Sequence, residues 1–351
     1  MLIGYMYHRK KPMGLNRAYA FASVAKAEGA ELLYFSPGAI DFEARRINGY
    51  VYRNGTWEDI VSPFPDVVCN VKNFFKKKQL EAAKRLQREI PFTSISVGTK
   101  MVVYNNLMKY KEFAAYLVPT ERVSSARRLL ALTEQYPRLV LKPAGGHQGE
   151  NICYIRRDGN VFKIQSDTGE INCDEAQISE FISDRLRQES YIAQPYINSR
   201  TKAGNPYDLR LHVQKNAGGE WVSAGIYPRI SADGGIICNI SRGGYTLELA
   251  DFLTEEFGGD AYDVKKYVEI FSLQLAAHLD EIQRELYGEE LDELGIDIGL
   301  DENRQIYIYE VNWKPGHPPL LHIDLSVVRN TIHYAMFLAS RKAAAQQTND
   351  E

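Results

Sequence analysis

The chain has 351 residues, more than one compact domain normally holds, so we expect two or three folded units. Hydrophobic residues make up 44% and charged residues 25%, which excludes wholesale disorder and leaves enough apolar material for a sizeable core. The formal net charge is −3, and no apolar run is long enough to span a membrane. We therefore expect a soluble, cytoplasmic, unexported chain with neither a nucleic acid nor a membrane as partner.

The first 95 residues alternate strand and helix signals and predict a small α/β unit. The apolar runs LIGYMY, ELLYFSP and PDVVCNV predict strands, and a helix-like segment beginning at Asn16 lies between the first two. Two aromatic-rich β runs are joined by Arg53, Asn54 and Gly55, and Asn-Gly is a strong hairpin signal. This pattern is typical of a Rossmann-like unit with an added hairpin.

Two further units follow. Helical segments leading into the strand RLVLKP predict a first lobe over residues 96–192. A β-meander, a long amphipathic helix and a closing hairpin predict a second lobe over residues 193–340. We expect a final helix from about Leu325 and a frayed tail at 341–351.

The hairpin IDIGLDENRQIYIYEVN is the most informative segment. Glu310 and Asn312 are two residues apart on a predicted strand, so their side chains leave the same face. With a tight turn, Leu300 lies opposite Tyr307, and Asp297 lies opposite Glu310. Two carboxylates and an amide are suitable ligands for Mg²⁺, with Mn²⁺ as an alternative ion. The other interpretation is a solvent-facing hairpin edge.

A glycine-rich loop follows the strand that carries Lys142. Gly145, Gly146 and Gly149 can bring backbone N–H groups close to phosphate oxygens, and Lys142 adds a positive charge. The segment matches neither of the usual nucleotide fingerprints, GxxxxGK[ST] and GxGxxG before a helix. A plain hairpin is the alternative.

Polar side chains near two later β runs form a third candidate group. Arg229 and Asn239 fall on or beside neighbouring strands and can point into one cleft, where guanidinium and amide donors stabilise an oxyanion or a transferring phosphoryl group. Surface ion pairs and turn residues are the alternative interpretation.

The joint order of these motifs resembles one known superfamily. The series KPAGGHQG, AQPYI, DLR, PRI, NISRGG, DIGLD and EVNWKPG resembles ATP-grasp proteins of the ribosomal-protein glutamate ligase type. Together with FSPGAI, INGYVY and PDVVCN it is most similar to the YheC/YheD-like, spore-coat-associated group, from about residue 1 to 335. The resemblance implies an ATP-grasp fold of two α+β lobes behind an N-terminal Rossmann-like (pre-ATP-grasp) domain at 1–95.

The resemblance also implies roles for individual residues in binding ATP and Mg²⁺. Lys142 and Lys100 correspond to the two phosphate lysines, with Lys109 and Lys111 as nearby alternatives to Lys100. The implied adenine contacts are Gln194, Tyr196 and Ile197, the implied ribose contact is Asp208, and the implied metal ligands are Asp297, Glu310 and Asn312.

The resemblance implies catalytic roles as well. Arg229 and Asn239 resemble the residues that hold the transferred phosphate in the glutamate-ligase type. Some relatives instead carry an arginine two residues before the first metal aspartate, and this chain has Gly295 there. We therefore expect Arg229 to stabilise the oxyanion, with Arg242 in reserve.

The implied activity is ADP-forming carboxylate–amine ligation through an acyl-phosphate, with small-molecule or peptide substrates. Two alternatives stay open. One is a kinase of the same fold that phosphorylates a hydroxyl, and the other is a spore-coat structural protein with a vestigial ATP site. The resemblance also leaves open a homodimer, association with a spore coat, and location in the mother-cell cytoplasm or the coat itself.

Overall fold

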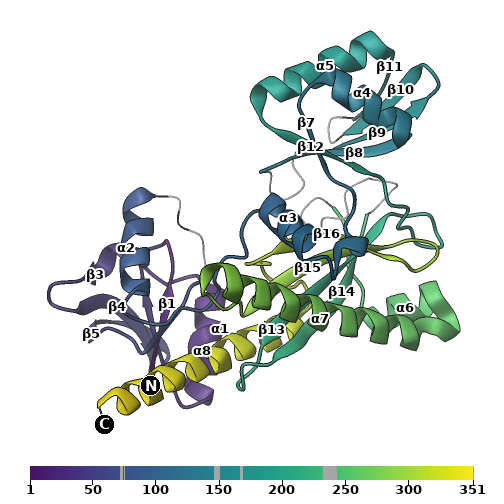
Figure 1. Cartoon of the computed structure of the whole chain (residues 1–351). Coiled ribbons are helices and arrows are strands. Elements are labelled where there is room, and N and C mark those ends of the chain that lie inside the picture. The colour runs from purple at the N-terminus through teal and green to yellow at the C-terminus, as the bar shows by residue number, and fades with distance from the viewer. Residues whose placement is uncertain (72–73, 75, 146–150, 167–168, 232–242, 351) are drawn as a thin grey trace.

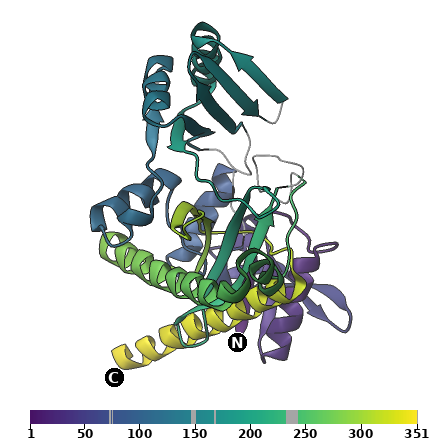
Figure 2. The ribbon, with the colours of Figure 1, turned by 90° about the vertical axis from the view of Figure 1, so that its right-hand side faces the viewer.

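Three β-sheets organise the chain into three bodies (Figure 1). The structure, a computed structural model, describes residues 1–71, 74, 76–145, 151–166, 169–231 and 243–350. The N-terminal unit lies at one end, the sheet of the second lobe lies in the middle, and the first lobe stands apart at the top of both views (Figures 1 and 2). Within the described part of the chain, no helix is long and apolar enough to cross a bilayer.

The N-terminal unit is a mixed sheet with helices on both faces. Its core strands β2, β1 and β6 are parallel, and the β4–β5 hairpin lies beside β2. As predicted, Asn54 and Gly55 form the hairpin turn, both with positive φ. The elements are β1 (Leu2–Met6), α1 (Asn16–Ala27), β2 (Glu31–Phe35), β3 (Ile40–Asp41), β4 (Arg46–Arg53), β5 (Thr56–Pro63), β6 (Val67–Cys69) and α2 (Lys77–Gln87).

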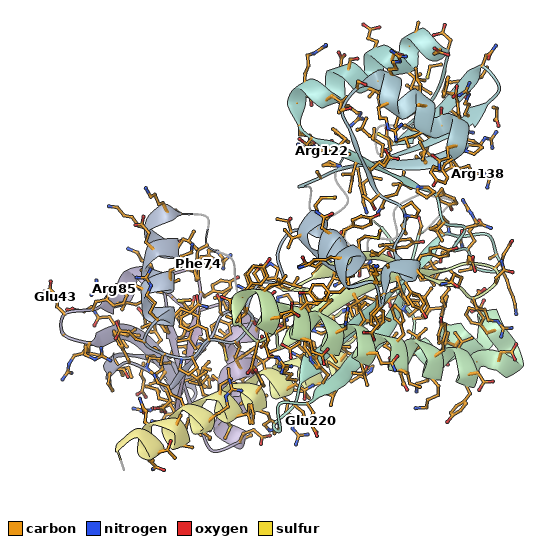
Figure 3. All side chains as sticks on the ribbon, viewed as in Figure 1. Glu43, Phe74, Arg85, Arg122, Arg138 and Glu220 are labelled. Atoms are coloured by element: carbon orange, nitrogen blue, oxygen red, sulfur yellow. The ribbon has the colours of Figure 1, made fainter. Side chains whose placement is uncertain are left out.

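The first lobe is an antiparallel sheet with the strand order β11-β10-β9-β8-β12-β7, covered by two helices. Figure 3 shows Arg122 and Arg138 on this lobe, far from Glu220. The expected boundary at 192 falls inside its strand β12. Its elements are β7 (Glu121–Val123), α4 (Ala126–Gln135), β8 (Arg138–Pro143), β9 (Cys153–Asp158), β10 (Val161–Ser166), β11 (Gly169–Cys173), α5 (Glu175–Gln188) and β12 (Tyr191–Pro195).

The second lobe is an antiparallel sheet ordered β14-β13-β15-β16. Helix α7 packs its apolar stripe on one face, as the periodicity predicted, and α3 packs on the same core although we expected it in the first lobe. The elements are α3 (Lys100–Tyr110), β13 (Tyr207–Lys215), β14 (Trp221–Ile230), α6 (Leu249–Phe257), α7 (Ala261–Tyr287), β15 (Glu293–Leu300), β16 (Ile306–Asn312) and α8 (Leu321–Asp350).

Helix α8 differs from the expectation at both ends. It begins at Leu321 rather than near Leu325, and it continues to Asp350, so residues 341–350 are helical rather than frayed. Its buried side, including Val328 and Ile332, packs with α1 in the core of the N-terminal unit. The last helix of the chain therefore completes the first domain.

Asp292, the residue before β15, forms a hydrogen bond to Ser94, which lies 198 residues earlier in the chain. The Asp292 side chain is 5% exposed and accepts a hydrogen bond from the Ser94 backbone N–H at 2.7 Å. Burial, reinforced by the charge of Glu293, raises the pKa of Asp292 to about 7. The folded protein therefore favours the protonated form of this carboxyl group.

We expect Asp292→Asn to change how stability depends on pH. Because the pKa of Asp292 is higher in the folded state, its contribution to stability is full below about pH 4 and is lost as pH rises toward 7. The wild type should lose roughly 4 kcal/mol relative to the variant across this range. Urea unfolding of both proteins between pH 4 and pH 8 measures the difference, and parallel profiles would contradict the assignment.

Candidate active site between the two lobes

Polar side chains occupy one face of the second-lobe sheet. Along β13, Leu209 and Leu211 point into the core against α7, while Asp208, Arg210 and His212 point to the opposite face. On β15 and β16, the paired residues Asp297 and Glu310 add two carboxylates beside this row. The alternation of each strand therefore builds a polar row over an apolar core.

The two predicted metal carboxylates lie opposite each other. Asp297 pairs with Glu310 in the β15–β16 register, as the hairpin geometry predicted. The expected pairing of Leu300 with Tyr307 is wrong by one residue, because Leu300 pairs with Ile306. An irregularity between Asp297 and Ile298 absorbs the difference and restores the carboxylate pair.

Two arginines hold the candidate metal ligand Asp297. Arg210 donates Nε and Nη2 to its two carboxylate oxygens, and Arg229 Nη2 lies 3.1 Å from Oδ2. Arg229 also donates two hydrogen bonds to Asp208, at 2.6 and 2.8 Å. Burial raises the pKa of Asp297, but the two guanidinium groups outweigh it and hold the pKa below its usual range.

This ion cluster changes the expectation for Asp208. The resemblance implied a contact between Asp208 and ribose, whereas the structure uses both of its carboxylate oxygens to bind Arg229. We therefore assign Asp208 to the positioning of Arg229. Arg210, which the sequence analysis left without a role, is the fourth member of the cluster.

Two lysines lie near Glu310 at the opening between the lobes. Lys100, the first residue of α3, places Nζ 2.8 Å from Oε2 of Glu310. Lys142 comes from β8 of the first lobe, and burial lowers its pKa to about 8 despite the opposing charge of Glu310. Lys109 and Lys111, the alternatives to Lys100, are both exposed.

An apolar pocket continues from these charged groups between the two lobes. The space between its side chains is about 430 Å³ when the open mouth is included. Side chains from α3, β12 and β16 line it, and Lys100, Lys142 and Glu310 mark its charged end. The apolar members include Met101, Tyr104, Leu107, Ile192, Ile308 and Val311.

Only part of the predicted nucleotide set lines this pocket. Gln194 does, but Tyr196 and Ile197 do not, and the Tyr196 ring packs on Tyr154 of β9 instead. Gly145 lies in an exposed turn after β8. Gly146, Gly149, Asn239 and Arg242 lie outside the described residues.

Asn312 pairs with Gly295, two positions from the Asp297–Glu310 pair. Among the described residues, no cluster of three or more His, Cys, Asp or Glu side chains is arranged to hold a metal. The predicted ligands are two carboxylates and an amide, which is the oxygen chemistry that Mg²⁺ prefers. Both carboxylates are ion-paired in the structure, so the ion would have to compete with Lys100, Arg210 and Arg229 for them.

Two glycines let the chain after β16 pack closely on the polar face. His212 lies between Gly225 and Gly295 in the sheet. A Cβ on Gly295 would lie 2.3 Å from Cβ of Pro315, and a Cβ on Gly225 would lie 2.5 Å from a methyl group of Ile323. Pro315 therefore occupies the space that a side chain at position 295 would need.

We expect Gly295→Ala to destabilise the protein by about 1–3 kcal/mol, because the added methyl group overlaps Pro315. Displacement of Pro315 would also strain the 2.8 Å hydrogen bond from Arg210 to its carbonyl. Gly38→Ala is the control, since a Cβ there meets nothing within 4 Å. Denaturant unfolding measures both, and equal stabilities would show that Pro315 moves freely.

Sequence reasoning missed Thr120 and the apolar pocket-lining side chains of α3, and it gave Arg210 no role. The alternation of DLR in a strand was a usable signal for Arg210, because it places Asp208 and Arg210 on one face. Apart from Lys100, whose role the resemblance implied, nothing local in the sequence indicates that α3 faces the pocket.

The three bodies and the cleft between two lobes define an ATP-grasp protein. A RimK domain ATP-grasp protein from Sphaerobacter thermophilus DSM 20745 superposes with a TM-score of 0.54 at 10% identity, covering 96% of this chain and 100% of that one. The D-alanine-D-alanine ligase from Coxiella burnetii gives a TM-score of 0.51 at 10% identity, covering 100% of this chain and 99% of that one. At such low identity the likeness concerns the fold alone.

The chain belongs to the YheC/D-like ATP-grasp family, whose sequence model matches residues 89–338. It is 25% identical over 333 residues to the endospore coat-associated protein YheD of Bacillus subtilis (strain 168), covering 89% of this chain and 72% of that protein. The endospore coat-associated protein YheC of the same strain is 25% identical over an alignment of 314 residues, and the match covers 84% of this chain and 84% of that protein.

Proposed function

We propose that this chain is an ATP- and Mg²⁺-dependent carboxylate–amine ligase. The observation that carries the proposal is the pocket between the lobes, apolar at one end and lined by Lys100, Lys142 and Glu310 at the other. Such a pocket suits a flat, apolar base and a polyanionic tail. Membership of the ATP-grasp family and the similarity in fold to a D-alanine-D-alanine ligase support ligation as the chemistry.

In the proposed reaction, an oxygen of the substrate carboxylate attacks the γ-phosphorus of ATP and ADP leaves. An amine then attacks the acyl carbon, phosphate leaves, and the amine gives up a proton to form the amide. Lys100 and Lys142 neutralise phosphate charge, and the glycine loop at Gly145, Gly146 and Gly149 encloses the phosphates. We propose that Arg229 binds the transferred phosphoryl group, and that Asn239 and Arg242 are its other contacts.

Asp297, Glu310 and Asn312 would hold Mg²⁺, which when bound supplies further charge neutralisation at the phosphates. For this to happen, the ion pairs of Asp297 and Glu310 have to open. The phosphates of ATP offer the released lysine and arginines a new anionic partner.

The test is phosphate release from ATP while amino acids and short peptides are screened in pairs. For an active pair, a carboxylate labelled with ¹⁸O should transfer one labelled oxygen to inorganic phosphate, and the product should have the mass of an amide. A phosphorylated product without free phosphate would instead identify a kinase. No turnover and no rise in melting temperature with nucleotide would favour a structural role, in keeping with the names of the coat-associated relatives.

A further inference from the structure

Thr120 and Gln194 form one polar edge of the otherwise apolar part of the pocket. Gln194 lies in β12, is 8% exposed, and donates Nε2 to Oγ1 of Thr120 at 2.7 Å. Thr120 immediately precedes β7, the strand that pairs with β12, and its backbone N–H donates to the Tyr104 hydroxyl at 3.3 Å. Both residues are therefore fixed by the sheet and by α3.

The hydrogen bonds of Thr120 determine which way the Gln194 amide faces. Oγ1 of Thr120 lies 2.8 Å from the carbonyl oxygen of Val118. A carbonyl oxygen has no proton, so the threonine hydroxyl donates its single proton there. Toward Gln194 the hydroxyl can then only accept, which requires the amide to present its NH₂ group to Thr120.

The carbonyl oxygen of this amide is left for an occupant of the pocket. Oε1 of Gln194 accepts no hydrogen bond from the described residues, and it is not one of their fully buried unpaired atoms. Because Nε2 is held by Thr120, the amide cannot rotate to exchange its oxygen for its NH₂ group without losing that hydrogen bond. The pocket thus offers a fixed acceptor and no interchangeable donor at this position.

We propose that Thr120, acting through Gln194, makes the pocket select adenine over guanine. The inference rests on the proposed nucleotide site and adds a specificity determinant to it. An exocyclic amine, as in adenine, donates to a fixed acceptor, whereas the carbonyl of guanine at the same ring position places two acceptors against each other. The free-energy cost of such an unpaired buried acceptor corresponds to an affinity about 10- to 100-fold higher for the adenine nucleotide than for the guanine nucleotide.

The experiment measures the affinities of ADP and GDP, each with Mg²⁺, by isothermal titration calorimetry. The wild type should bind ADP about 10- to 100-fold more tightly than GDP. In Thr120→Val, which keeps the side-chain shape, the amide is free to turn, and the ratio should fall to within about 3-fold. Thr120→Ser retains the hydroxyl and should keep the wild-type ratio.

Two further variants separate this role from a structural one. Thr133→Val removes another part-buried hydroxyl of the same lobe, one that donates to the Leu130 carbonyl at 2.7 Å, and should leave the ratio unchanged. In the Thr120→Val background, Gln194→Glu should restore the preference for ADP, because a carboxylate has no NH₂ group to turn toward the base.

A wild type that binds ADP and GDP equally, or a Thr120→Val variant that keeps the wild-type ratio, would overturn the inference. Equal binding would leave the proposed nucleotide site standing. A wild type that binds neither nucleotide would overturn the proposed function as well, so the two failures are distinguishable.

Discussion

Glu310→Gln should reduce ATP turnover by about 100-fold or more while leaving the protein folded. Glutamine has nearly the same shape, and the Glu310 side chain is 22% exposed, so little packing is lost. The negative charge is lost, however. Glu310 forms an ion pair with Lys100, and its charge also favours the protonated form of Lys142. Steady-state phosphate release and the thermal midpoint, measured on one preparation, test both parts of the expectation.

The control for this variant is Glu302→Gln, the same substitution in the exposed turn of the same hairpin. It should leave turnover unchanged. Near-normal turnover in Glu310→Gln, with an unaltered dependence on Mg²⁺, would remove Glu310 from the set of metal ligands.

Asp280→Ala should cost about 3–5 kcal/mol of stability, the largest effect on folding that we expect. Asp280 of α7 is fully buried and lies 2.8 Å from Nζ of Lys215, whose side chain is only 5% exposed. It also accepts hydrogen bonds from the Leu291 backbone at 2.7 Å and from Arg284 at 2.7 Å. Removing it leaves the Lys215 ammonium and the Leu291 N–H buried without their carboxylate.

The matched control is Glu290→Gln. Glu290 lies 3.9 Å from the same Lys215 nitrogen but is 32% exposed, so its substitution should cost less than about 1 kcal/mol. Chemical unfolding of the two variants compares the buried and the exposed partner of one lysine. A loss below about 1 kcal/mol in Asp280→Ala would mean that water or another carboxylate reaches Lys215.

The hairpin of the second lobe shows how much the sequence can predict. The prediction that Asp297 lies opposite Glu310 came from an assumed tight turn, and it is correct because the irregularity beside Asp297 offsets the error of one residue at Leu300. The irregularity beside Asp297 was not predictable, since its signal is spread over backbone geometry rather than residue type. The prediction succeeded at the carboxylates and missed the pairing of Leu300 near the turn.

The missed parts of the site depend on contacts between segments distant in sequence. Val103 and Leu107 identify a buried side of α3, but an apolar stripe does not indicate which sheet it will cover. In the sequence, Thr120 is an ordinary residue after a proline. Its contact with Gln194 depends on the position of β12 in the folded sheet. The pairing of Asp208 with Arg229 likewise needed the β13–β14 register, which the sequence leaves undefined.

The packing of α8 on the N-terminal unit has a consequence for biosynthesis. Ala18 and Phe21 of α1 share a core with α8, a helix that the ribosome makes long after α1. During translation the first domain therefore emerges with part of its apolar surface uncovered, because α1 ends at Ala27 and the helix that will cover it begins only at Leu321. A nonsense mutation before residue 321 would remove that cover and expose a surface of the kind that chaperones and proteases recognise.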